Sequence, residues 1–91
     1  MDAAVVDKEV SLLQHTIAKY GLKDDAGRFY VPFGQLYTDT QDIFEALAGT
    51  LKTAKKRGLV EYSAPILLKG PSDKVAITLL KEAEGPPPAG H

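Results

Sequence analysis

The sequence contains no cysteine, and only two of its 91 residues are histidine. Without cysteine the chain has no disulfide framework, no thiolate metal site and no cysteine nucleophile. His15 and His91 have no neighbours at a spacing that suits a metal site. The serines also lack the glycine-flanked context of a nucleophile elbow. The sequence therefore predicts no catalytic residue, no metal, no other cofactor and no small-molecule substrate.

The chain also lacks an excess of either charge and any long apolar run. Its 11 Lys and Arg residues and 12 Asp and Glu residues give a formal net charge of −1. General nucleic-acid binders usually carry a clear basic excess, so the composition disfavours nucleic acid as a partner. No apolar run approaches the roughly 20 residues of a membrane-spanning helix. The first residues lack the pattern of a secretory signal. We expect a cytoplasmic protein with no membrane contact.

The length and composition predict one domain around one core. With 91 residues, of which 44% are hydrophobic, the chain can bury a modest core. We assign this domain to residues 1–83. Residues 84–91 are rich in proline and glycine and have no apolar anchor, so we expect them to form a disordered tail.

The clearest periodic pattern runs from Asp42 to Arg57 and is closed by Gly58. Its apolar residues recur at steps of three and four, as on one face of a helix. They are Phe44, Leu47, Ala48, Leu51 and Ala54. Three residues at 38–40 are candidates for the N-cap. Acidic residues come first and basic residues last, an order that suits the helix dipole. The pattern predicts a long helix over 42–57.

A first helix is predicted near the N-terminus, with Gly21 as its left-handed stop. Its apolar residues are Val6, Val10, Leu13, Ile17 and Tyr20. This spacing also fits a coiled-coil seam, but it covers only about two heptads. We therefore expect the helix to pack within the chain and the protein to be a monomer. A short strand at 28–31 and a brief helix at 33–37, with Phe33, Leu36 and Tyr37 directed inward, follow in the sequence.

After Gly58 the hydrophobic period changes from 3.6 to 2. Strands are predicted at 59–62, 66–69 and 74–80, with a turn at 70–73 that makes an antiparallel hairpin. Three helices followed by a β-hairpin is the arrangement of a winged helix. The strand at 28–31 could pair with this hairpin as a short third strand. The expected fold class is therefore α+β and winged-helix-like.

Four runs of residues resemble the Costars family over roughly residues 6–80. They are Val31–Tyr37, Phe44–Arg57, Leu67–Gly70 and Asp73–Leu80. Members are small stand-alone eukaryotic proteins similar to the actin-binding C-terminal domain of the striated-muscle activator of Rho signalling. The resemblance implies a winged-helix-like fold, no enzymatic activity, and a role in actin dynamics and cell motility. It implies actin or an actin regulator as the partner.

The outer stripe of the long helix is the candidate protein-binding site. Actin is an acidic protein, so charge complementarity favours the basic end of the helix for docking. The candidate residues are Glu45, Gly49, Lys52, Lys55, Lys56 and Arg57. Gly49 is either a notch for a partner or relief for a tight approach to the first helix or the wing. A basic end that only matches the helix dipole is the competing interpretation.

Two alternative functions stay open. Winged helices often place their third helix in the DNA major groove. Here Asp42 and Glu45 lie at the N-terminal end of that helix, where phosphates would repel them, so the residues disfavour DNA. The second alternative is an adaptor that binds another cytosolic protein through the same basic end.

Overall fold

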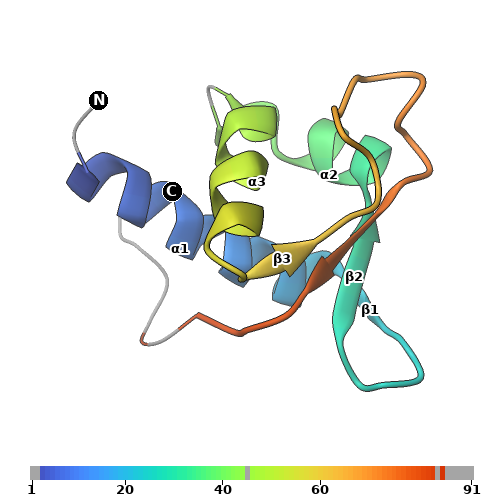
Figure 1. Ribbon diagram of the computed structural model, residues 1–91, viewed down its shortest axis with the longest axis horizontal. Coiled ribbons are helices and arrows are strands. Elements are labelled where there is room, and N and C mark those ends of the chain that lie inside the picture. Colours follow the sequence, from blue (N-terminus) through green and yellow to red (C-terminus); the bar gives the residue numbers. More distant parts are fainter. Residues whose placement is uncertain (1–2, 45, 84, 86–91) are drawn as a thin grey trace.

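The computed structural model describes residues 3–44, 46–83 and 85, and within them three helices and four strands form a mixed α+β fold (Figure 1). The elements in order are α1 (Ala3–Tyr20), β1 (Leu22–Lys23), β2 (Phe29–Pro32), α2 (Phe33–Asp39), α3 (Leu47–Lys56), β3 (Val60–Glu61) and β4 (Ala76–Leu79). The predicted α+β class is confirmed, and the three helices lie where the sequence places them in the chain order.

The four strands form one antiparallel sheet in the order β1-β2-β4-β3. At its centre Val31 of β2 is opposite Ile77 of β4, and both side chains are fully buried. The predicted pairing of the strand near Phe29 with the C-terminal strand is therefore confirmed. β2 ends at Pro32, which cannot donate to a ladder, and α2 begins at the next residue.

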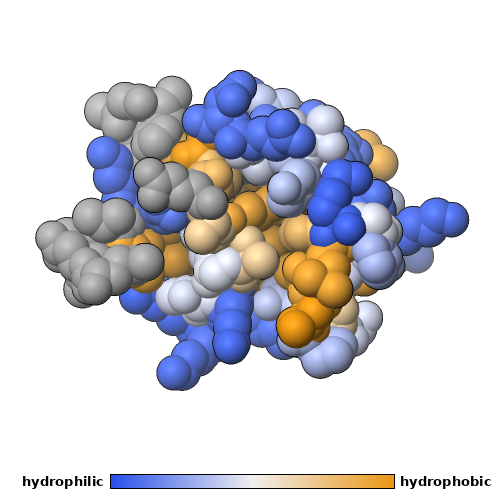
Figure 2. Space-filling view, turned by 90° about the horizontal axis from the view of Figure 1, so that it is seen from above, coloured by the Kyte–Doolittle hydropathy of each residue, from blue (hydrophilic) through white to orange (hydrophobic). Residues whose placement is uncertain are grey.

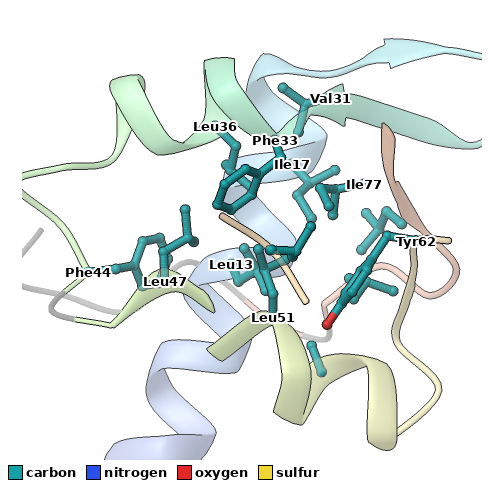
Figure 3. Packing of buried hydrophobic residues seen from close by; sticks show 14 of the residues in the cluster. Leu13, Ile17, Val31, Phe33, Leu36, Phe44, Leu47, Leu51, Tyr62 and Ile77 are labelled. Atoms are coloured by element: carbon teal, nitrogen blue, oxygen red, sulfur yellow. The ribbon is translucent and has the colours of Figure 1, made fainter. Parts of the chain in front are cut away.

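The core lies between the three helices and the sheet (Figure 3). Every helix contributes fully buried apolar side chains, and β2 and β4 supply others from the sheet: Leu13, Ile17, Val31, Phe33, Leu36, Leu51, Ala54 and Ile77. The helical periods predict the buried helix positions correctly, but Ala48, which the pattern places on the apolar face of the long helix, is exposed. Tyr20 and Tyr37 differ, because 40% and 37% of their surfaces are exposed.

α3 begins at Leu47 and not at Asp42, so the predicted start of the long helix is wrong. Thr40 closes α2 instead: its N–H and its hydroxyl donate to the Leu36 carbonyl at 3.1 and 2.6 Å. The Phe44 N–H then donates to the Thr40 carbonyl at 3.2 Å in a turn. Phe44 is buried although it lies in this turn. Its place in the periodic pattern therefore reflects burial and not helical structure.

The N-cap prediction at 38–40 is also wrong. The N-cap of α3 is Ala46, whose side chain makes no capping hydrogen bond. Because the turn separates Thr40 from α3, none of the predicted caps reaches the first N–H groups of the helix. The predicted end is correct: Gly58 follows α3 with a φ of +75°, which only glycine adopts readily.

The predicted hairpin between 66–69 and 74–80 is not formed. β4 pairs with β3 and β2, and residues 62–75 form a loop between β3 and β4. Leu67 is buried while its two neighbours are exposed, an alternation typical of a strand. This segment nevertheless pairs with no strand that the structure describes. The predicted turn at 70–73 is present, with the Asp73 N–H donating to the Gly70 carbonyl at 3.2 Å.

Gly21 ends α1 by a different mechanism from the one predicted. Its φ is not positive. A Cβ at this position would lie 2.5 Å from the Ile17 carbonyl oxygen and 2.8 Å from the Tyr30 carbonyl oxygen. Glycine is therefore required because the backbones of α1 and β2 approach closely here.

Some predictions fall outside the described residues. The proposed tail at 84–91 does so apart from Gly85, and the division of the chain at residue 83 stays a prediction. In the part of the chain that the structure describes, no helix combines the length and the apolar character needed to cross a membrane.

Candidate functional site

The outer face of α3 presents the candidate site to solvent. The opposite face packs into the core through Leu47, Thr50, Leu51 and Ala54. The Thr50 hydroxyl lies 3.1 Å from a carboxylate oxygen of Glu9, which ties α3 to α1. Gly49, Lys52 and Lys56 are exposed and, three and four residues apart, share one stripe of the helix. The predicted member Glu45 lies outside the described residues.

Two of the four basic residues are held by the protein itself. The Lys55 ammonium donates to the Tyr62 carbonyl and lies 4.3 Å from the centre of the Tyr62 ring. Arg57 pairs with Asp7 of α1, with 2.7 Å between Nη1 and Oδ1. These contacts fix Lys55 against β3 and Arg57 against α1.

Lys52 and Lys56 are the other two basic residues, and both are exposed. Neither has a hydrogen bond, ion pair or ring contact with any residue that the structure describes. Because they are one turn apart, both side chains extend into solvent from the same face of α3. Among the predicted basic residues, these two are the cations available to a partner without breaking a contact within the chain.

The contacts of Lys55 and Arg57 differ in strength. The Arg57 and Asp7 side chains are 42% and 63% exposed, so this surface pair contributes less than about 1 kcal/mol. Tyr62 is buried, and burial raises the pKa of its phenol above the ordinary value. The Lys55 contact combines a hydrogen bond to the Tyr62 carbonyl with a cation–π contact to the buried Tyr62 ring.

Gly49 faces open space. Among the described residues, a Cβ at this position would meet only the Cβ of Ala46, at 3.8 Å, which is ordinary van der Waals contact. The interpretation that Gly49 relieves a tight approach to α1 or to the wing is therefore wrong. The absence of a side chain leaves the backbone of α3 accessible beside Lys52.

A small pocket lies at the other end of α3, where the turn from α2 enters the helix. Its volume is about 290 Å³, and it is lined by Tyr37, Thr40, Gln41, Phe44 and Leu47. Figure 2 views the molecule from above, onto this end, and shows hydrophobic surface between hydrophilic borders. The sequence carries no signal for this pocket, because the pocket exists only where the turn at 40–44 replaces the predicted first turn of the helix.

The residues described by the structure do not include a cluster of three or more His, Asp or Glu side chains that could hold a metal ion. His15 is half-buried, and its Nε2 atom has no hydrogen-bond partner. A single histidine without a second ligand is not a metal site.

Comparison with protein families gives a match over residues 5–80 to the model described as Costars. The chain belongs to the Costars family. The Costars family protein ABRACL of Xenopus laevis is 47% identical over 79 residues, which cover 85% of this chain and 98% of that protein. Human Costars family protein ABRACL is 46% identical with the same coverage. A Costars family protein of Oryza sativa subsp. indica is 45% identical over 86 residues, 92% of this chain and 93% of that protein.

A solved structure supports the fold. The solution structure of human HSPC280 protein is 45% identical, with a TM-score of 0.81, and covers 88% of this chain and 96% of that chain. The resemblance read from the sequence is thus confirmed at the level of the family.

Two residues that shape the basic end of this Costars chain were missed by the sequence analysis. Asp7 lies fifty positions before its partner Arg57, and Tyr62 seven positions after Lys55. Local periodicity carries no signal for contacts between different elements, so only the packing of α3 against α1 and β3 reveals them.

Proposed function

We propose that this chain is a non-enzymatic cytoplasmic protein that modulates actin filament dynamics and cell motility. It acts by contact with actin or an actin regulator through the basic end of α3. Membership of the Costars family supports the partner class through the resemblance stated above. The observation that carries the proposed site is the exposed, unpaired state of Lys52 and Lys56 within the described part of the chain.

The geometry of α3 suits an acidic protein surface. Two free ammonium groups one turn apart attract carboxylates at long range and orient the partner as it approaches. Gly49 lies on the same stripe and offers no side chain, so a partner can approach the helix backbone next to Lys52. Cations and an open backbone on one face together form a contact surface for a protein partner.

We also propose that the fold is of the winged-helix type. The supporting observations are the element order and the position of β4 between β2 and β3. In such a fold α3 would be the helix that reads DNA. The net charge of −1 and the use of Arg57 and Lys55 in contacts within the chain favour a protein partner over nucleic acid.

Co-sedimentation with actin filaments tests the proposal. Lys52→Glu combined with Lys56→Glu should weaken pelleting about tenfold or more, because both free cations become repulsive. Lys19→Glu combined with Lys23→Glu is the matched control, since it changes the net charge equally at α1 and β1. The control should pellet like the unmodified protein.

Two results would overturn the proposal. Equal pelleting of the folded Lys52 and Lys56 variant would show that these cations are not the site. Absence of pelleting by the unmodified protein, together with tight duplex DNA binding that falls steeply with salt, would favour the nucleic-acid alternative.

A further inference from the structure

The charges of this nearly neutral chain are strongly segregated. Residues 52–75 contain six Lys and Arg residues and two acidic residues, a formal charge of +4. The rest of the chain contains five Lys and Arg residues and ten acidic residues, a formal charge of −5. The basic part comprises the C-terminal half of α3, β3 and the β3–β4 loop at 62–75. An acidic partner would therefore be attracted more strongly to this part of the chain than to the rest.

The β3–β4 loop places two aliphatic side chains in solvent within this basic part. Ile66 is 63% exposed and Leu68 is 55% exposed. Leu67 between them is buried, with 8% exposed. Because side chains alternate along an extended segment, Ile66 and Leu68 point outward together while Leu67 anchors the segment to the core.

Hydrogen bonds within the loop hold this exposed pair in place. Ser72 is buried, and its hydroxyl accepts from the Leu68 N–H at 3.0 Å and donates to the Ile66 carbonyl at 3.4 Å. The Ser72 N–H donates to the Leu68 carbonyl at 2.9 Å. The backbone on both sides of Leu67 is thus fixed by one side chain.

Asp73 fastens the end of the same loop. Its carboxylate accepts from the Gly70 N–H at 2.7 Å and from the Lys69 ammonium at 2.8 Å. Its carbonyl accepts from the Gly34 N–H at 3.0 Å, which joins the loop to α2. The approach is so close that a Cβ on Gly34 would lie 2.8 Å from the Asp73 side chain. The loop is therefore a built structure that exposes two aliphatic groups.

We propose that Ile66 and Leu68 are the apolar anchors of the interface whose charges Lys52 and Lys56 supply. The loop begins at Tyr62, whose carbonyl accepts from Lys55, so the segment that carries the apolar pair starts at the basic end of α3. The occupant is an acidic protein surface with an apolar recess for two aliphatic side chains. Charged groups around an apolar centre are the usual anatomy of a protein interface. This inference rests on the proposed function and adds a second contact to it.

The test uses the full chain and actin filaments in co-sedimentation. Ile66→Ser combined with Leu68→Ser should weaken pelleting about tenfold or more, because transfer of both aliphatic groups out of water is lost. Leu22→Ser is the matched control: Leu22 is 69% exposed and lies on β1, at the opposite edge of the sheet from β3. The control should pellet like the unmodified protein. All variants should keep the melting temperature of the unmodified protein, and single substitutions at 66 or 68 should each give part of the effect.

The possible failures are distinguishable. If the unmodified protein does not pellet, the proposed function and this inference fall together. If it pellets and the folded 66/68 variant pellets equally, only the apolar anchors are refuted. Sedimentation velocity of the free protein adds one outcome: a dimer that these substitutions abolish would identify a second copy as the occupant, and would overturn the proposed partner.

Discussion

Replacing Gly49 by alanine should stabilise the protein. Glycine inside a helix costs about 0.5–1 kcal/mol relative to alanine, chiefly through the freedom of the unfolded chain. Of the residues that the structure describes, the new methyl group would meet only Ala46, at 3.8 Å from its Cβ, so we expect no steric cost to offset this gain. For a domain of this size, a gain of about 1 kcal/mol raises the melting temperature by roughly 4–8 °C.

Thermal unfolding followed by circular dichroism measures this effect. Ala48→Gly is the matched control, because Ala48 is also exposed in the first turn of α3 and the reverse change should lower stability by a similar amount. Binding to actin filaments supplies a second readout. If a partner approaches the open backbone at Gly49, the alanine variant should be more stable and bind more weakly.

A lower melting temperature for Gly49→Ala would refute the reasoning, since it would mean that the position is not open. Increased stability with unchanged binding would leave the helix argument intact and exclude Gly49 from the interface. Stability and binding therefore test two separate statements about one residue.

Three further predictions concern the core and the basic end. Leu51 is fully buried, so Leu51→Ala should cost about 2–5 kcal/mol in a urea titration, and a loss below about 1 kcal/mol would contradict the core assignment. Arg57→Gln should cost less than about 1 kcal/mol, and a melting comparison at low and high salt should show that difference shrinking as salt screens the pair with Asp7. Burial raises the pKa of Tyr62, so its phenol contributes stability below the ordinary pKa of 10.0 that is lost as pH rises further. Melting curves on both sides of that pH should show the loss, and Tyr62→Phe should remove the Tyr62 part of it.

The parts of the fold that the sequence predicts are those where periodicity coincides with burial. Leu13 and Ile17 of α1 and Leu51 of α3 are fully buried at the spacing their helices require. The start of α3 is not predictable in this way. Phe44 fits the helical period, but it reaches the core from a turn that the Thr40 carbonyl organises. A threonine in that position can close one helix as readily as it can begin the next.

The β region shows the same limit. Residues 66–68 alternate in exposure like a strand, yet Ser72 and not a ladder satisfies the backbone around Leu67. β1 has two residues, too few for any periodic signal. Strand identity depends on a partner elsewhere in the chain, and the pattern of one segment does not contain that partner.

The sequence predicts which basic residues lie at the candidate site, but not which of them are already engaged in contacts within the chain. The sequence groups four basic residues at the end of α3, and all four are exposed. Only tertiary packing separates Lys55 and Arg57, which contact Tyr62 and Asp7, from Lys52 and Lys56. The pairing of side chains from distant elements is fixed by the assembled fold.

The lengths of the strands have a consequence for the behaviour of the protein at high concentration. Both edges of the sheet, β1 and β3, are two residues long, and each carries one charged side chain, Lys23 or Glu61. Short and charged edges give another chain almost no row of free N–H and C=O groups on which to add a strand. The longer strands, β2 and β4, lie between them, with β1 covering Phe29 and Tyr30 of β2 and β3 covering Thr78 and Leu79 of β4. The sheet therefore protects itself from edge-to-edge aggregation without closing into a barrel.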